Sequence, residues 1–213
     1  MGSEASTGAR DGHRRGLIVD YGGVLTSSPF LSFQRFCTTE GLDENAILAR
    51  VRADAEAREL VYALETGELP ELEFEARFAA MLGVEPERLI DRLFAHYEPD
   101  ERMLAAIARA RAGGIRTGLL SNSWGTRRYD RGQLAELFDG VVISGEVGMR
   151  KPAPEIYALG AERAGLAPAD CVFVDDMRVN LDVPAELGMA TVLHVNADDT
   201  IAELEALLGV SLA

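Results

Sequence analysis

The chain has 213 residues, enough for one core domain with an inserted segment, and a formal net charge of −14 at pH 7. This acidic balance argues against a nucleic-acid partner and against binding to an anionic membrane surface. Residues 1–15 are polar and basic without an apolar run, so we expect a flexible tail, no signal peptide and a cytoplasmic protein. Cys37 and Cys171 are expected to be buried apolar residues rather than a disulfide.

Residues 16–25 predict the first strand of a parallel sheet, followed by a tight turn. Residues 17–19 are an apolar run without alternation, which is typical of a strand that is covered on both faces. The run ends at Asp20, and open α/β sheets bind their ligands at the carboxyl ends of such strands. Gly22 and Gly23 allow a sharp turn and a close approach of the backbone to a ligand. Alternatively, Asp20 simply caps the turn.

Residues 26–99 show no strand pattern and predict an all-helical insertion. Aromatic residues recur at helical spacing in two parts of this segment. They are Phe30, Phe33 and Phe36 in the first part, and Phe74 and Phe78 in the second. We expect these aromatic side chains to form the core of the insertion rather than to contact a ligand. After residue 99, helical and strand patterns alternate, as in an α/β domain with a parallel sheet.

Three further apolar runs also end in small polar or charged residues. They are residues 115–120 before Ser121 and Asn122, residues 141–143 before a loop with Lys151, and residues 171–174 before Asp175 and Asp176. Hydroxyl and amide groups suit the oxygens of a bound anion. Two adjacent carboxylates at a strand end repel each other unless a cation lies between them, and Mg²⁺ is a hard divalent ion that such ligands favour. Taken alone, the Asp175–Asp176 pair is equally consistent with a solvated turn.

Lys151 is the only lysine among the 21 lysine and arginine residues of the chain. An ammonium is a compact charge that approaches an anion head-on, which the planar guanidinium of arginine does not reproduce. Pro152 and Pro154 stiffen the backbone on one side of Lys151. A single surface lysine left in an arginine-biased chain is the simpler alternative. The polar residues at the other strand ends favour a specific role for this lysine at an anion-binding site.

In order and spacing, these motifs resemble those of the haloacid dehalogenase-like (HAD) hydrolases over about residues 16–195. The stretch Gly148–Tyr157, and the Asp175–Asp176 pair followed by Asn180, are similar to the subgroup that contains the phosphatase domain of soluble epoxide hydrolases. The resemblance implies a Rossmann-like parallel-sheet core of the α/β class with an inserted small all-helical cap. The implied core comprises residues 16–25 and 100–213, and the implied cap comprises residues 26–99.

The same resemblance implies a two-step phosphoryl transfer, with Mg²⁺ as the cofactor and a small phosphorylated metabolite as the substrate. Asp20 and Lys151 would be the catalytic residues: Asp20 attacks phosphorus and forms an aspartyl phosphate, which water then hydrolyses. The implied phosphate-binding groups are Ser121, Asn122 and Lys151. The implied metal ligands are Asp20, the backbone carbonyl of Gly22, Asp176, and Asp175 directly or through a water. Neither the substrate nor the oligomeric state follows from the sequence.

Gly22 departs from the family pattern, in which a second aspartate at this position protonates the leaving group and later activates water. Losing such an acid–base group typically costs about 10²- to 10⁴-fold in rate. One alternative is a phosphatase that is slow or restricted to good leaving groups, in which Tyr21 or a substrate group shares the proton transfer. Another is a different chemistry of the family. The last is a catalytically impaired protein that binds a phosphorylated ligand or a partner. We favour the phosphatase.

Overall fold

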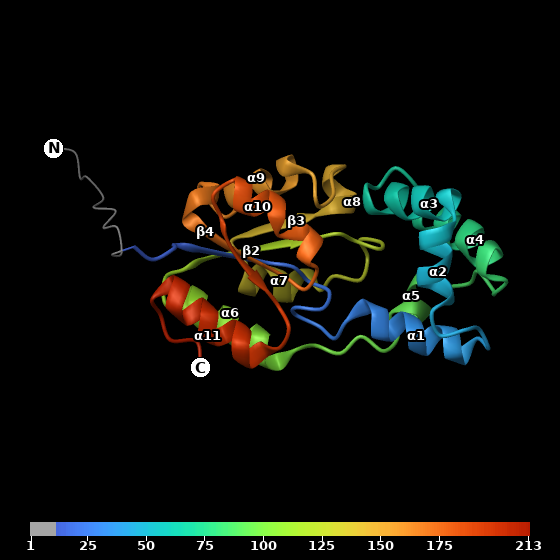
Figure 1. Ribbon diagram of the computed structural model, residues 1–213, viewed down its shortest axis with the longest axis horizontal. Coiled ribbons are helices and arrows are strands. Elements are labelled where there is room, and N and C mark those ends of the chain that lie inside the picture. The colour runs from blue at the N-terminus through green and yellow to red at the C-terminus, as the bar shows by residue number, and fades with distance from the viewer. Residues whose placement is uncertain (1–11) are drawn as a thin grey trace.

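The computed structural model describes residues 12–213, and within them five strands form a single parallel sheet in the order β3-β2-β1-β4-β5 (Figure 1). They are β1 (Gly16–Val19), β2 (Arg116–Ser121), β3 (Gly140–Ile143), β4 (Cys171–Asp175) and β5 (Ala190–Leu193). This sheet confirms the predicted α/β class, and β5 is a strand that the sequence analysis did not single out. Of the predicted tail, residues 1–11 lie outside the described residues.

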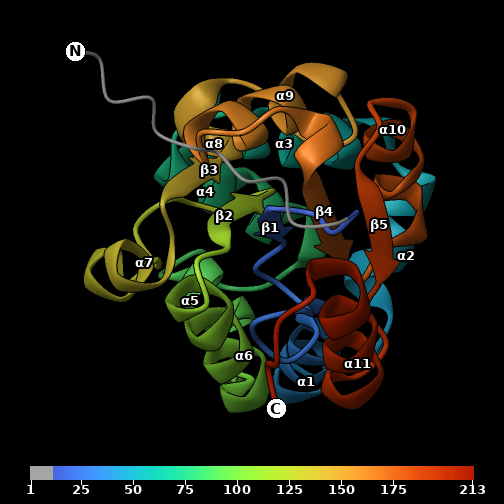
Figure 2. The ribbon, with the colours of Figure 1, turned by 90° about the vertical axis from the view of Figure 1, so that its left-hand side faces the viewer.

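Helices cover both faces of the sheet (Figures 1 and 2). One face carries α6 (Glu101–Ala112), α7 (Arg131–Leu137) and α11 (Ala197–Leu208), and the other carries α9 (Pro154–Arg163) and α10 (Asp182–Glu186). The short α8 (Ser144–Val147) follows β3, and 3₁₀ turns span Pro168–Asp170 and Arg178–Asn180. Within β1, Leu17 and Val19 join the core on the α6 side, whereas Ile18 packs on the α9 side. Both faces are buried, which explains the unbroken apolar run.

Local sequence signals set the ends of the core helices. Asp100 caps α6, because its Oδ1 accepts hydrogen bonds from the backbone N–H groups of Arg102 and Met103 at 3.0 Å each. α9 begins at Pro154, whose fixed φ suits the first turn of a helix. α11 ends at Gly209, which adopts the left-handed conformation with φ of 65°. These capping residues fix where α6 and α9 begin and where α11 ends.

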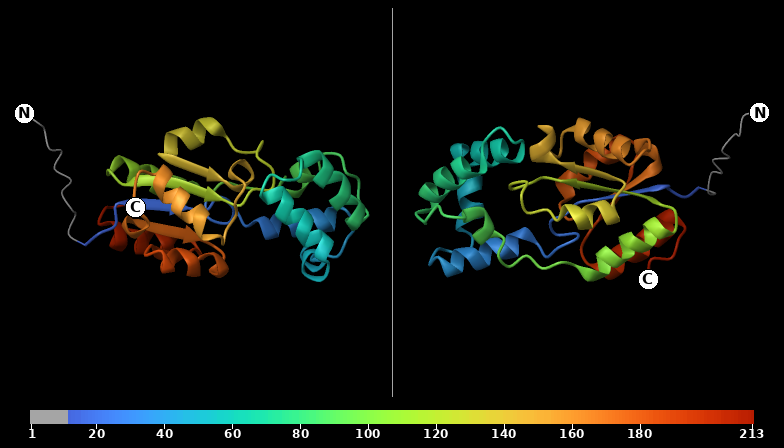
Figure 3. Two further views of the ribbon diagram at one scale, coloured as in Figure 1. Left: turned by 90° about the horizontal axis from the view of Figure 1, so that it is seen from above. Right: turned by 180° about the vertical axis from the view of Figure 1, so that it is seen from behind.

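A second group of helices lies between β1 and α6 in the chain and beside the carboxyl edge of the sheet (Figures 1 and 3). They are α1 (Pro29–Thr39), α2 (Ala46–Ala53), α3 (Ala55–Glu65), α4 (Glu71–Leu82) and α5 (Leu89–Leu93). We call residues 29–93 the helical unit. Its apolar side chains form a hydrophobic cluster of their own, in which the predicted aromatic residues Phe33, Phe74 and Phe78 are buried. The boundaries and the cap role implied by the resemblance stay predictions.

Trp124, in the loop after β2, joins the helical unit to the core. Its indole Nε1 donates a hydrogen bond to Oε1 of Glu65 in α3 at 2.9 Å. The same ring lies 5.0 Å from the ring of Phe33 and 5.6 Å from that of Phe74, measured between centroids. Nearby, the chain passes between the two units at an antiparallel bridge of Thr26 with Pro99. These contacts hold the helical unit over the carboxyl ends of β1 and β2.

The cysteines and the helix lengths bear on two general properties of the chain. Cys37 and Cys171 are both free and buried, as predicted. No helix within residues 12–213 combines the length and the apolar character needed to cross a membrane.

Candidate active site

The candidate site lies where the order of the strands reverses. β1 is central, the chain continues through β2 and β3 on one side, and it then returns to β4 and β5 on the other. Open α/β sheets form their ligand crevices at such a switch point. A cavity of about 370 Å³ opens there. Its lining includes the predicted site residues Asp20, Gly22, Ser121, Asn122, Lys151 and Asp176. Asp175 lies beneath them, with none of its surface exposed.

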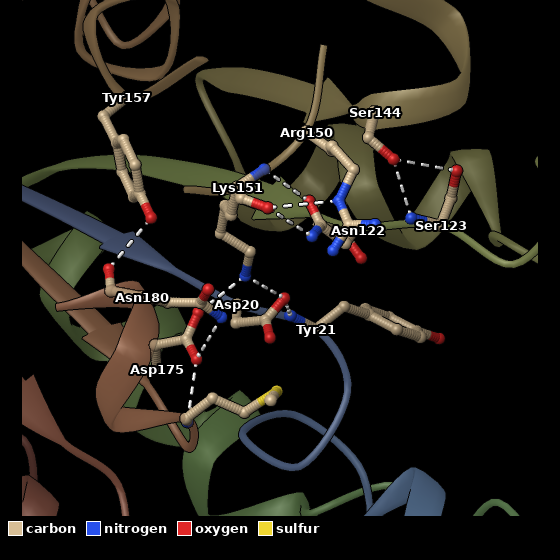
Figure 4. A network of polar contacts seen from close by, with 12 residues as sticks. Asp20, Tyr21, Asn122, Ser123, Ser144, Arg150, Lys151, Tyr157, Asp175 and Asn180 are labelled. Atoms are coloured by element: carbon tan, nitrogen blue, oxygen red, sulfur yellow. Dashed lines mark hydrogen bonds and ion pairs between the residues drawn. The ribbon is translucent and has the colours of Figure 1, made fainter. Parts of the chain in front are cut away.

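Lys151 is buried between two carboxylates, with 1% of its surface exposed (Figure 4). Its Nζ lies 2.9 Å from Oδ1 of Asp20 and 2.6 Å from Oδ2 of Asp175. The ammonium therefore bridges the carboxyl ends of β1 and β4. Burial disfavours its charge, but the charges of Asp20 and Asp175 outweigh burial and raise the pKa of Lys151. A surface lysine left over by chance would not occupy such a position.

The side chain of Asn122 holds the backbone of Lys151 (Figure 4). Its Oδ1 accepts a hydrogen bond from the backbone N–H of Lys151 at 2.8 Å, and its Nδ2 donates to the backbone carbonyl of Lys151 at 3.1 Å. The amide of Asn122 thus ties the end of β2 to the loop after α8. This positioning role was not expected from the sequence, and contact of Asn122 with a phosphate stays a prediction.

Asp175 and Asp176 differ in what surrounds them. Oδ1 of Asp175 accepts hydrogen bonds from the backbone N–H of Met177 at 2.8 Å and from Nδ2 of Asn180 at 3.0 Å. Asp176 instead faces the turn after β1. A Cβ added at Gly23 would lie closer than 3.0 Å to its carboxylate, and Gly23 also has a positive φ of 78°. Glycine is therefore required at position 23 both by its backbone conformation and by this close approach.

The electrostatics of the cluster favour a bound cation. Burial raises the pKa of Asp20 to about 7, and although Lys151 opposes this shift, the charges of Asp175 and Asp176 add to it. Burial and the charge of Asp175 raise the pKa of Asp176 to about 6. One ligand atom from each of the three carboxylates lies within 4.8 Å of the others. Because a single ammonium cannot balance them, this set of oxygen donors fits a hard divalent cation.

Phenol groups surround the other side of Asp20. Ser121 Oγ lies 2.9 Å from the hydroxyl of the buried Tyr129. The rings of Tyr21 and Tyr129 are 5.0 Å apart. The backbone N–H of Tyr21 donates to Oδ1 of Asp20 at 2.7 Å, whereas its ring points away from the Lys151 ammonium in Figure 4. Tyr21 thus contributes its backbone N–H to Asp20, and its ring forms part of an aromatic wall.

The helical unit and two adjoining segments close the cavity. Phe30 and Phe33 of α1 line it, together with Tyr97, which follows the helical unit, and Arg128, which lies in the loop after β2. The guanidinium carbon of Arg128 lies 3.6 Å above the ring of Phe94. Its Nε is buried without a hydrogen-bond partner in the described part of the chain. Sequence reasoning missed Tyr97 and Arg128, since neither belongs to a motif and only the fold brings them to the site.

Comparisons with known proteins agree with this geometry. A family model of haloacid dehalogenase-like hydrolases matches residues 15–185. The chain is 33% identical over 133 residues to bifunctional epoxide hydrolase 2 of Sus scrofa, a match that covers 59% of the chain and 24% of that protein. It is 30% identical over 107 residues to glyceraldehyde 3-phosphate phosphatase of Methanopyrus kandleri, covering 48% of the chain and 46% of that protein. The chain therefore spans less than half the length of either relative.

Solved structures share the fold. A HAD family enzyme of Bacteroides thetaiotaomicron, determined as a magnesium complex, superposes with a TM-score of 0.64 at 22% identity. The superposition covers 85% of this chain and 93% of that one, and at this identity it shows the fold alone. The family match extends over most of the sequence and includes the carboxyl ends of β1, β2 and β4. The chain thus belongs to the haloacid dehalogenase-like hydrolases.

Proposed function

We propose that the protein is a Mg²⁺-dependent phosphatase that hydrolyses the phosphoric monoester of a small phosphorylated metabolite. The observation that carries this proposal is the buried contact of Lys151 with Asp20 in a cavity that Ser121 also lines. A carboxylate held beside an ammonium and a hydroxyl is suited to attack a phosphoryl group, whose oxygens need positive charge and hydrogen-bond donors. The family match and a relative named as a phosphatase support the same reaction class.

Asp20 is the proposed nucleophile. Its Oδ1 is held by Nζ of Lys151 at 2.9 Å and by the backbone N–H of Tyr21 at 2.7 Å. These two donors fix the plane of the carboxylate, so that its second oxygen can approach phosphorus in line with the leaving group. The carboxylate displaces the leaving oxygen and forms an aspartyl phosphate. Water then attacks that phosphorus, releases inorganic phosphate and restores the carboxylate.

The remaining residues would hold the phosphoryl oxygens and the metal. Ser121, Lys151 and the side-chain N–H of Asn122 that does not bind Lys151 would donate to the phosphoryl oxygens. The proposed metal ligands are Asp20, the backbone carbonyl of Gly22, Asp176, and Asp175 directly or through a water. When bound, Mg²⁺ would neutralise these carboxylates and withdraw charge from the phosphoryl oxygens. Since Gly22 supplies no acid, fast turnover requires either a good leaving group or a proton donor from elsewhere in the protein.

A phosphatase screen tests this proposal. The wild type and Asp20→Asn are assayed on a panel of phosphorylated metabolites, with Mg²⁺ and with a chelator. We expect activity that the chelator abolishes and that Asp20→Asn lacks, because the amide has nearly the shape of the carboxylate but is a poor nucleophile. Asp182→Asn is the matched control, because Asp182 is an exposed aspartate at the start of α10 and should retain full activity.

A binding measurement separates an enzyme from a protein that only binds phosphate. Beryllofluoride with Mg²⁺ mimics an aspartyl phosphate and should raise the melting temperature of the wild type but not of Asp20→Asn. The absence of a shift in the wild type, together with the absence of turnover, would reject the phosphatase. It would favour a catalytically impaired protein that binds a phosphorylated ligand or a partner.

A further inference from the structure

The space beside Gly22 is filled by a side chain from another part of the protein. Gly22 is not among the glycines with positive φ, so its backbone does not by itself require glycine. A Cβ built on it, however, would lie closer than 3.0 Å to the hydroxyl oxygen of Tyr97, a separation that real Cβ atoms essentially never show. The Tyr97 hydroxyl therefore excludes any larger residue at position 22 unless Tyr97 moves.

That hydroxyl occupies the place where an acid group at position 22 would act. Standard bond lengths put the carboxylate oxygens of an aspartate about 2.4 Å from its own Cβ. The hydroxyl oxygen of Tyr97 lies within the same short range of the Cβ position of Gly22. Tyr97 also lines the cavity that contains Asp20. An O–H group thus reaches the same neighbourhood of Asp20 from the segment that follows the helical unit.

The position of Tyr97 is set by well-packed surroundings. Its ring lies 5.1 Å from that of Phe94 and 6.4 Å from that of Tyr21. The next residues are tied to the start of the helical insertion, because the backbone N–H of Ser27 donates to the carbonyl of Glu98 at 2.7 Å. The segment that carries Tyr97 is therefore anchored to the segment that follows Gly22. Together with the ring packing, this hydrogen bond keeps the Tyr97 hydroxyl beside Gly22.

Arg128 places a positive charge beside this phenol. Its guanidinium carbon is 5.6 Å from the centroid of the Tyr97 ring. Arg128 forms no salt bridge with a carboxylate among residues 12–213. Its charge is therefore not neutralised by an acidic partner and can stabilise negative charge that develops on the Tyr97 oxygen.

We propose that Tyr97 supplies the proton that Gly22 cannot, so that the protein remains a phosphatase for esters with poor leaving groups. This inference rests on the proposed function. As Asp20 attacks phosphorus and the bond from phosphorus to the ester oxygen breaks, the Tyr97 hydroxyl gives its proton to that oxygen, and the alcohol leaves. The phenolate of Tyr97 then takes a proton from the water that attacks the aspartyl phosphate. Inorganic phosphate departs, and both Asp20 and Tyr97 return to their starting states.

The decisive variant is Tyr97→Phe, which keeps the ring and removes only the hydroxyl. Its kcat/KM is compared with that of the wild type on an alkyl phosphate and on p-nitrophenyl phosphate, at one Mg²⁺ concentration. We expect a loss of about 10²-fold or more on the alkyl ester and little change on p-nitrophenyl phosphate, whose leaving group needs no proton. Tyr62→Phe is the matched control, because it removes a hydroxyl from an exposed tyrosine of α3.

A merely structural role for Tyr97 would lower both activities equally, and that result would overturn the inference. Unchanged activity on both esters would overturn it as well. A wild type without turnover of p-nitrophenyl phosphate would reject the proposed function itself. A wild type that turns over p-nitrophenyl phosphate, with no change in the ratio of the two activities in Tyr97→Phe, would reject only the role of Tyr97. The two failures are therefore distinguishable.

A rescue experiment adds an independent test. Gly22→Asp alone should lower the melting temperature and the activity, because the new side chain meets the Tyr97 hydroxyl. Combined with Tyr97→Ala, which clears that space, Gly22→Asp should restore alkyl phosphate turnover above the level of Tyr97→Ala alone. Full tolerance of Gly22→Asp in the presence of Tyr97 would contradict the inference, because it would show that the two groups do not share one place.

Discussion

Replacing Asp176 by asparagine should stabilise the metal-free protein while abolishing its response to Mg²⁺. Burial and the charge of Asp175 raise the pKa of Asp176 from 3.8 to about 6 in the folded protein. The folded state therefore binds this proton more tightly than the unfolded state does, and stability is lost as the pH rises between these two values. The loss is small near pH 4 and below, grows as the pH rises to about 6, and becomes constant above about pH 7.

The magnitude follows from the same shift. One pKa unit corresponds to about 1.36 kcal/mol, so a rise from 3.8 to about 6 sets an upper limit of about 3 kcal/mol. Asp176 is partly exposed, and solvent screening reduces this to about 1–2 kcal/mol. Asp176→Asn should therefore melt about 2–8 °C above the wild type at pH 7.5 in EDTA. Near pH 4 the two proteins should melt together.

Adding Mg²⁺ should reverse this order. A ligand at about 100 times its dissociation constant stabilises the folded state by about 2.7 kcal/mol. The wild type should gain this stability, whereas Asp176→Asn should not, since it lacks a proposed metal ligand. The measurement is a set of thermal melts at pH 4 and 7.5, with EDTA or Mg²⁺, and Asp182→Asn serves as the control. An Asp176→Asn variant that is less stable in EDTA at pH 7.5, or that gains as much from Mg²⁺ as the wild type, would refute the reasoning.

Other substitutions test the rest of the site. Lys151→Arg should lose at least about 10²-fold in turnover and should melt earlier, because a planar guanidinium does not fit between Asp20 and Asp175; near wild-type turnover would show that the ammonium is dispensable. Gly23→Ala should lower the free energy of unfolding by about 1 kcal/mol or more and weaken the Mg²⁺-dependent rise in melting temperature. An unchanged melting temperature would show that the positive φ at position 23 does not require glycine. Phe74→Ala should lower the free energy of unfolding by about 3–5 kcal/mol, because Phe74 is fully buried. It should also change the fluorescence emission of Trp124, the only tryptophan, whose ring packs against that of Phe74. An unchanged emission would argue against this ring contact.

The core of the fold and most of the site could be predicted from the sequence because the signals are local. Residues 17–19 show an apolar run without alternation, and a strand buried on both faces has no solvent side to supply polar residues. Asp20, Ser121 and Asp175 end such strands, so their meeting follows from the parallel order of the sheet. Because lysine is otherwise absent from the sequence, a specific role was predicted for Lys151, and the structure places it between two carboxylates.

Contacts between segments that are distant in the chain could not be predicted in this way. β5 carries no chemical motif, and its place beside β4 is decided by pairing in the sheet. The sequence suggested phosphate binding for Asn122, which stays a prediction, and gave no sign that both ends of its amide hold the backbone of Lys151, 29 residues away. The pairing of a side chain with a backbone group depends on where a loop returns, which residue type alone does not encode.

The contrast between local sequence signals and contacts of distant segments is clearest at Gly22. The motifs, the parallel α/β core and the absence of an acidic side chain two residues after Asp20 can all be read from residue type and spacing. The group that lies beside Gly22 in place of an acidic side chain is known only from the folded chain. Tyr97 lies 75 residues further along the chain, and it reaches Gly22 because the helical insertion leaves and returns at the Thr26–Pro99 bridge. Loop closure brings such distant residues together in space, and no local sequence pattern predicts which of them will meet.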